Sequence, residues 1–251
     1  LPDHADPPRR HMTAHLGLIA AVRDRLRAMG APEKAGPMRD YMKSDLPFHG
    51  VQAGPRRRAL DGIFAAYPIG DSVTWDDTAR TLWRAATHRE ERYAAVQLTG
   101  HHLYRDYQGP GAVGLYEDLI VAGAWWDYVD EIAVRRIGPM LRDDPAHMRP
   151  IIRTWASSGD LWLRRTAIIC QNTAGAATDA RLLFDVIEPN LGHQGFFIRK
   201  AIGWALRSYG RVDPDAVVRF IGATEQWMSP LSRREALKNL TDVEPAARAR
   251  S

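Results

Sequence analysis

Two tryptophans and three carboxylates stand together near the middle of the sequence, in the stretch Trp125-Trp-Asp-Tyr-Val-Asp-Glu131. Trp126 and Asp130 are four residues apart, so a helix would place both side chains on one face. An aromatic plane and an anion that look into the same space suit a flat, cationic target that carries a sugar. The stretch is therefore the first candidate for a functional site.

Each of these residues also has a purely structural interpretation. If Asp127 caps the helix, Asp130 lies three residues later, at the capping-box position. Tryptophan is more often packed in a core than presented to a ligand, and the sequence contains eight tryptophans. Those expected to pack in the core are Trp75, Trp83, Trp125 and Trp155.

The composition is that of an ordinary globular chain. Of 251 residues, 45% are hydrophobic and 25% are charged, which is typical of water-soluble domains. No run of eighteen apolar residues occurs, so no membrane span is expected. The single cysteine, Cys170, lies in an apolar helical pattern and is expected to be a buried thiol. These features favour the cytoplasm.

Arginine dominates the basic residues. The 34 basic side chains comprise 30 arginines and 4 lysines, and the net charge is +4. Arginine is the better bidentate partner for phosphate, but a GC-rich genome also raises arginine content without any functional cause. Arg56, Arg57 and Arg58 open a predicted helix, where positive charge opposes the helix dipole. Either a nearby anion offsets that cost, or the three side chains are solvated at the surface.

The first residues differ from the rest of the sequence. Residues 1–10 contain three prolines and mixed charges, and they lack the apolar core of a signal peptide. We therefore expect residues 1–12 to be a disordered lead-in and residues 13–251 to form a single domain.

Helical periodicity covers most of the remaining chain. Apolar residues recur three to four positions apart over 13–29, which predicts an amphipathic helix closed by Gly30. A second helix is expected from Pro32 to Lys43, and a third from Pro55. Few stretches alternate with period two, so we expect an all-α protein. The further predicted helices are 73–88, 90–107, 111–122, 126–142, 145–157, 161–173, 178–188, 196–209, 214–223 and 231–240.

Similar helical segments recur at a nearly constant interval. They begin at Glu90, Trp126, Trp162, Phe197 and Ser232, at spacings of 36, 36, 35 and 35 residues. Four nearly equal spacings of helix-pair length predict a HEAT-like α-solenoid, whose second helices would line one concave face. The residues on or near those helices that would make this face aromatic and basic are Trp126, Asp130, Arg165, Trp204 and Arg207. Such a face would suit a duplex backbone.

Seven motifs, in a fixed order after residue 13, give the sequence a family likeness. The sequence resembles the AlkD-type DNA alkylation repair glycosylases, which are built from HEAT-like repeats. The Trp-Trp-Asp-x-Val-Asp and Lys-Ala-Ile-Gly-Trp motifs are specific when they occur together. The matching segments are Met38-Arg-Asp-Tyr-Met-Lys43, Gly50-Val-Gln52, Arg56-Arg57, Trp125-Trp-Asp-Tyr-Val-Asp130, Leu161-Trp-Leu-Arg-Arg165, Phe197-Ile-Arg-Lys-Ala-Ile-Gly-Trp-Ala-Leu-Arg207 and Pro230-Leu-Ser-Arg-Arg-Glu-Ala236.

The resemblance implies hydrolysis of the N-glycosidic bond of cationic N3- or N7-alkylated purines in duplex DNA, without base flipping. It implies that Asp130 is the catalytic carboxylate, flanked by Trp126 and Trp204. It also implies that no metal, cofactor or lyase lysine takes part, and that the enzyme acts as a monomer at the nucleoid. Some relatives remove bulky antibiotic-derived N3-alkyladenine adducts as self-resistance, which is a possible subtype. The residues expected to bind DNA are Arg165, Arg207, Tyr41, Gln52, Arg56 and Arg57.

A carboxylate near C1′ also makes chemical sense on its own. A cationic purine leaves without a general acid, and the developing oxocarbenium charge of the sugar is what needs stabilisation. Arg165 has a structural alternative, a salt bridge to an acidic neighbour on the next repeat. A rival for the whole protein is a non-catalytic helical-repeat module that binds damaged DNA or a protein partner.

Overall fold

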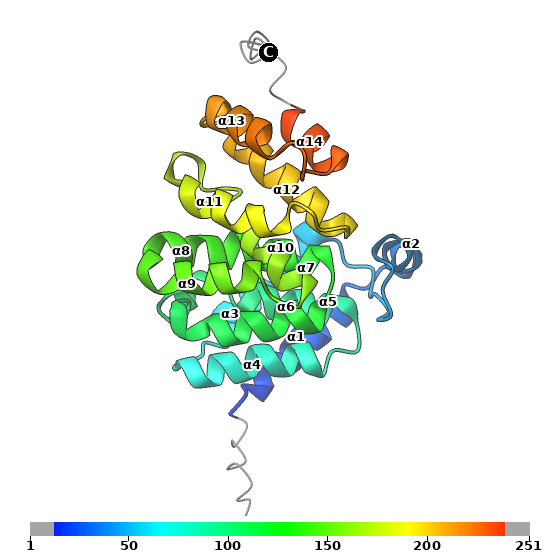
Figure 1. Cartoon of the computed structure of the whole chain (residues 1–251). Helices are drawn as coiled ribbons and strands as arrows, with labels where there is room; N and C mark the ends of the chain where they lie inside the picture. The colour runs from blue at the N-terminus through cyan, green and yellow to red at the C-terminus, as the bar shows by residue number, and fades with distance from the viewer. Residues whose placement is uncertain (1–12, 239–251) are drawn as a thin grey trace, which may run out of the picture. The chain divides into compact units, whose positions relative to one another are not determined.

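The computed structural model describes residues 13–238, and all the regular secondary structure in that range is helical (Figure 1). The predicted all-α class is confirmed. The predicted lead-in, residues 1–12, lies outside the described residues, as does the end of the predicted helix 231–240. None of the described helices is long and apolar enough to cross a membrane.

The chain divides into two compact units, one ending at Tyr107 and the other starting at Gln108. We describe each unit by itself. The single domain over residues 13–251 stays a prediction, as do the curvature and the basic concave face.

The described part of the first unit, from residue 13 onward, contains five α-helices. Their bounds are α1 (Leu16–Ala28), α2 (Pro32–Met42), α3 (Ala53–Ala66), α4 (Ser72–Arg84) and α5 (Arg89–Leu98). The predicted apolar stripe of α1 is buried at Leu18, Ile19, Val22 and Leu26. Helix α1 packs on α3, α4 and α5, and α4 packs on α5. The core of this unit therefore forms between α1 and its neighbours.

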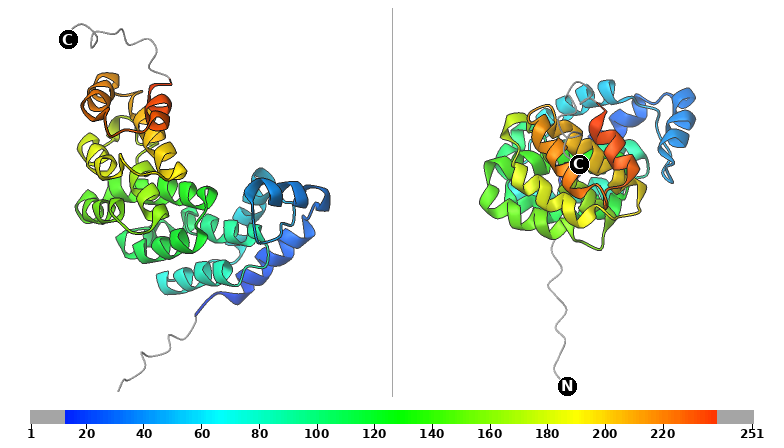
Figure 2. Two further views of the ribbon diagram at one scale, coloured as in Figure 1. Left: turned by 45° about the vertical axis from the view of Figure 1, so that its right-hand side comes forward. Right: turned by 45° about the horizontal axis from the view of Figure 1, so that its top comes forward.

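The second unit continues the helical pattern, and its helices from green to red are seen in pairs in Figure 2. Aspartate or serine caps five of these helices at their N-termini, which satisfies backbone N–H groups in the first turn. The bounds are α6 (Val113–Gly123), α7 (Trp126–Ile132), α8 (Gly138–Asp143), α9 (Pro145–Ala156), α10 (Leu161–Ile169), α11 (Ala180–Ile187), α12 (Phe196–Tyr209), α13 (Pro214–Thr224) and α14 (Pro230–Leu237).

The predicted repeat starts all fall at or near the beginnings of helices. Glu90 lies in α5, and the other four lie in α7, α10, α12 and α14. In the second unit α7 packs on α10, α10 on α12, and α12 on α14. Helices about 35 residues apart in the sequence are thus neighbours in space, as a helical-repeat fold requires.

Some predicted boundaries differ from the observed ones. The predicted helix 90–107 ends at Leu98, and a 3₁₀ segment follows at His102–Tyr107. Helix α3 begins at Ala53, two residues before the predicted start at Pro55. A π-helical segment, Ala133–Ile137, joins α7 to α8 within the predicted helix 126–142. Such segments are often found beside functional sites.

Candidate active site

Asp130 on α7 and Arg165 on α10 form a bidentate ion pair in the second unit. Arg165 Nε donates to Asp130 Oδ1 at 2.7 Å, and Arg165 Nη2 donates to Oδ2 at 2.8 Å. The Asp130 side chain is 18% exposed and the Arg165 side chain is 7% exposed. This two-bond geometry fixes the plane of the carboxylate as well as its position.

Arg165 also connects this pair to the next helix of the series. Its Nη1 atom donates to the carbonyl oxygen of Phe197 in α12 at 2.7 Å, and its guanidinium carbon lies 5.9 Å from the centroid of the Phe197 ring. One buried arginine therefore links α7, α10 and α12 and orients the Asp130 carboxylate.

The electrostatics of Asp130 combine opposing effects. Burial raises the pKa of the Asp130 carboxyl and outweighs the hydrogen bonds and charge of Arg165, which lower it, while the charge of Asp127 raises it further. Burial penalises the carboxylate because its charge loses hydration. A cation placed beside Asp130 would favour the ionised form.

The structural alternatives for the two residues have different outcomes. Trp125 is the N-cap of α7, and the Asp130 carboxylate binds Arg165, so the capping-box interpretation of Asp130 is wrong. Arg165 does form a salt bridge, but its partner is Asp130 on the preceding repeat and not a residue of the next one.

The tryptophans divide between core and partly exposed positions. Trp75, Trp83 and Trp155 are buried, as predicted. Trp126, at the start of α7, is half-buried, and Trp204 is half-buried against the core cluster that surrounds α12. Both candidate aromatics thus retain exposed surface, and their part in catalysis stays a prediction.

An aromatic cluster lies next to the ion pair, and only one of its members was predicted to pack. The Trp125 ring centroid is 5.8 Å from that of Phe197 and 6.4 Å from that of Trp162, and Trp162 is 4.9 Å from Phe197. Phe197 belongs to this cluster and also accepts the Arg165 hydrogen bond. The repeat pattern could have predicted this cluster, because Trp162 and Phe197 are both repeat starts and so occupy equivalent positions on successive repeats.

Arg207 lies further along α12 and is paired. Its Nη1 atom donates to Glu235 Oε2 at 2.8 Å and to the Glu235 carbonyl oxygen at 3.0 Å. Lys200 Nζ lies 3.1 Å from Glu235 Oε1. Hydrogen bonds from Arg207 and Lys200 lower the pKa of Glu235. The contact of Arg207 with DNA stays a prediction.

The other four predicted DNA-binding residues lie in the first unit. Tyr41 is 75% exposed at the end of α2, and exposed Gln52 accepts a hydrogen bond from Lys34 Nζ at 3.3 Å. Arg57 is exposed, whereas Arg56 is buried with its guanidinium carbon 4.3 Å from the Tyr93 ring centroid. The two adjacent arginines therefore differ in exposure, and Arg56 packs against Tyr93 inside the unit.

Glu90, noted in the sequence only as a repeat start, has a positioning role in the first unit. Its buried carboxylate accepts hydrogen bonds from the backbone N–H groups of His49, Gly50 and Val51 at 2.9–3.0 Å. Gly50 has φ +87°, and a Cβ atom there would lie 2.1 Å from the Ala31 carbonyl oxygen. Glu90 thus holds the tight segment that leads to Gln52.

Comparison with known families agrees with this architecture. The family model described as DNA alkylation repair enzyme matches residues 22–240. The chain belongs to this family. Membership gives the protein a role in DNA alkylation repair and accounts for the motifs shared across both units.

A solved structure of a member of this kind is also similar. It is described as a predicted DNA alkylation repair enzyme from Enterococcus faecalis, and it is 26% identical with a TM-score of 0.77. The match covers 85% of this chain and 98% of that chain. No curated protein matches significantly. The family fold therefore extends over most of the DNA alkylation repair chain described here.

Proposed function

We propose that this member of the DNA alkylation repair family is a monofunctional DNA glycosylase. It hydrolyses the N-glycosidic bond of cationic N3- or N7-alkylated purines in duplex DNA, without extruding the base from the stack. The observation that carries the proposal is the oriented, largely buried Asp130 carboxylate in a chain of this family. The enzyme would act as a monomer on DNA in the cytoplasm.

In the proposed reaction the alkylated base needs no protonation before it leaves. Its positive charge is neutralised as the electrons of the C1′–N bond move to the purine, and positive charge develops on the sugar. Asp130 stabilises this oxocarbenium charge and orients the water that attacks C1′, as carboxylates do in glycoside hydrolysis. No step requires a metal ion.

The aromatic residues and Arg165 have supporting roles in this proposal. Trp126 and Trp204 offer ring faces to the cationic base or the deoxyribose. Arg165 has five N–H donors, of which two bind Asp130 and one binds the Phe197 carbonyl. Its two further N–H groups form no hydrogen bond within residues 13–238, and we assign them to a DNA phosphate that approaches the 7% of the side chain that is exposed. Arg165 would then orient the carboxylate and the substrate together.

The test is base release from duplexes that carry N7-methylguanine, N3-methyladenine or a bulky N3-alkyladenine. Asp130→Asn keeps the shape of the side chain but removes the charge, so we expect single-turnover base release to fall by about 10²–10³-fold. Asp143→Asn, which changes an exposed aspartate at the end of α8, is the control and should retain activity. Binding of each variant to an uncleavable duplex shows whether the DNA site has survived.

Each outcome of this assay assigns a function. Release by the wild type and the control but not by Asp130→Asn supports the glycosylase, and the preferred adduct distinguishes general repair from self-resistance. Tight binding without release of any adduct would instead support the non-catalytic DNA-binding module.

A further inference from the structure

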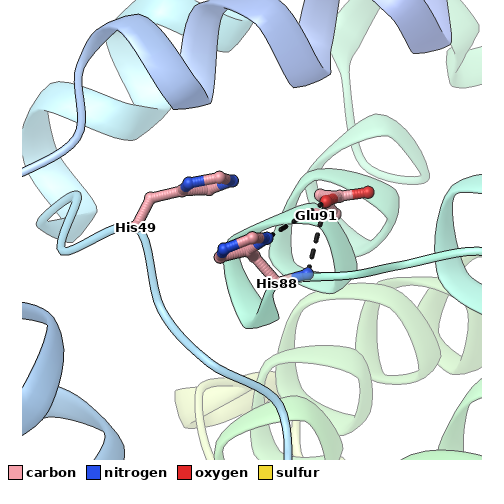
Figure 3. A group of neighbouring side chains, drawn as sticks. All are labelled: His49, His88 and Glu91. Carbon is pink, nitrogen blue, oxygen red and sulfur yellow. Dashed lines mark hydrogen bonds and ion pairs between the residues drawn. The ribbon is translucent and has the colours of Figure 1, made fainter.

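Three potential metal ligands meet in the first unit, and none of them is a residue that the proposed reaction uses. His49 lies on the segment between α2 and α3, His88 is the N-cap of α5, and Glu91 lies in the first turn of α5 (Figure 3). Their ligand atoms all lie within 4.8 Å of one another. The imidazole rings are stacked, with centroids 3.7 Å apart. No pattern in the sequence predicted this group.

The donor set has the chemistry of a transition-metal site. Two imidazoles and a carboxylate suit Zn²⁺ and related divalent ions, and water completes the coordination in sites with three protein ligands. Imidazole binds such ions through a neutral ring nitrogen. All three side chains are at least partly buried, which reduces the hydration that a bound ion must displace.

The hydrogen bonds around this group differ between its three members. Among the described residues, no side chain or backbone group forms a hydrogen bond with the His49 ring nitrogens. Glu91 Oε2 accepts from Arg23 Nε at 2.8 Å, and Glu91 Oε1 accepts from Thr87 Oγ1 at 2.7 Å and from the backbone N–H groups of Thr87 and His88 at 3.3 Å. His88 Nδ1 lies 3.1 Å from Thr87 Oγ1, so an ion would compete with these bonds for His88 Nδ1 and Glu91 Oε1. Oε1 lies 3.9 Å from His88 Nδ1 and is the carboxylate atom that would face the ion. Arg23 would then balance part of the Glu91 charge and orient the carboxylate.

We propose that His49, His88 and Glu91 bind one divalent transition-metal ion, with Zn²⁺ the best match to the donors. The two rings are within 10° of parallel, while imidazole lone pairs lie in the ring plane, so one ring turns out of the stack when the ion binds. The ion joins the segment before Gln52 to the N-terminus of α5. It supplements the hydrogen bonds from that segment to Glu90 and has a structural role, separate from base release.

Metal binding is measured on the full, untagged chain without DNA, so the result does not depend on the glycosylase proposal. Titration of the metal-free protein with Zn²⁺ in a calorimeter should give one bound ion per chain at micromolar protein concentration. His49→Ala and His88→Gln should each weaken binding by about tenfold or more, because each removes one of three ligands. Zn²⁺ should also raise the melting temperature of the wild type but not of these variants.

His147→Ala is the matched control. His147 also has an acidic partner, Asp144, but it does not belong to the group of His49, His88 and Glu91. It should bind Zn²⁺ as the wild type does. If His49→Ala does not fold, as judged by circular dichroism without metal, His49→Gln takes its place. Absence of Zn²⁺ binding by the wild type would overturn the proposal, and so would unchanged affinity in either His49 or His88 variant.

Discussion

At the scale of single residues, burial makes the ionised form of Asp130 unfavourable in the folded protein. Burial raises the pKa of this carboxyl, so ionisation costs more in the folded than in the unfolded chain. Its favourable effect on stability is complete below the unfolded pKa and is lost as the pH rises through the higher folded pKa. At neutral pH Arg165 offsets part of that cost, and the cationic substrate would offset more.

The raised pKa predicts the pH dependence of the proposed reaction. Base release requires the Asp130 carboxylate, so its rate should fall on acidification at a pH above the ordinary aspartate value of about 4. Single-turnover release of N7-methylguanine between about pH 4 and 8 measures this limb, with spontaneous release in enzyme-free samples subtracted. A rate that stays constant down to pH 4, with the protein still folded, would contradict the role of Asp130 as the essential anion.

At the scale of elements, buried groups shape the segments that carry the candidate residues. Glu90 accepts three backbone N–H groups from the segment before α3. Glu90→Gln would replace one acceptor oxygen by an amide NH₂ group, which cannot accept a hydrogen bond from the backbone N–H groups that face it. We expect the free energy of unfolding to fall by about 2–3 kcal/mol, the usual size for hydrogen bonds to a buried charged group.

Chemical denaturation measures this loss, and Glu33→Gln provides the control. Glu33 is exposed in the first turn of α2, where a surface substitution should change the unfolding free energy by less than about 0.5 kcal/mol. Equal stability of Glu90→Gln and the control would show that the segment before α3 does not depend on Glu90.

Helices α12 and α14 approach closely because residue 203 is a glycine. A Cβ atom there would lie 2.4 Å from Glu235 Cβ and 2.9 Å from the Ser232 carbonyl oxygen. Gly203→Ala should therefore push α14 away and lower the free energy of unfolding by about 1–3 kcal/mol. The glycine of the Lys-Ala-Ile-Gly-Trp motif is thus explained by packing.

Gly222→Ala in α13 is the matched comparison for Gly203→Ala. An added Cβ atom at Gly222 meets nothing within 4 Å, so alanine should raise the unfolding free energy by about 0.5–1 kcal/mol through its better helix propensity. Denaturation curves of the two variants should shift in opposite directions. A shift of both in the stabilising direction would contradict the close α12–α14 contact.

At the scale of the whole molecule, the net charge of +4 is too small to support the proposed duplex binding without local contacts. Each arginine–phosphate contact that is lost should reduce the slope of log K against log salt by about one. We expect this reduction for Arg57→Ala, measured by anisotropy with an uncleavable duplex. Arg25, also exposed but not among the predicted contacts, is the control and should keep the wild-type slope.

A slope for Arg57→Ala equal to that of the wild type would remove Arg57 from the DNA interface. Arg56 is unsuitable for this test because it is buried against Tyr93, and its loss would disturb the fold. The contrast between the adjacent arginines shows why exposure must guide the choice of variants.

The sequence by itself determined the helices, the spacing of the repeat and the family motifs. These follow from local periodicity, helix caps and breakers, which act within a few residues of one another. The alignment of Trp126 and Asp130 on one face also required only the helical period. The π-helical segment after α7 and the end of α5 at Leu98 were missed, because tertiary packing and local turns override an apolar pattern that continues through them.

Only the tertiary structure decided which side chains meet. Asp130 and Arg165 were both predicted as site residues, but their mutual pairing depends on the packing of α7 against α10. The His49–His88–Glu91 group joins positions up to 42 residues apart, and no helical period relates a loop residue to a helix N-terminus. The sequence sets the faces of single helices, whereas contacts between segments depend on how the folded chain places one against another.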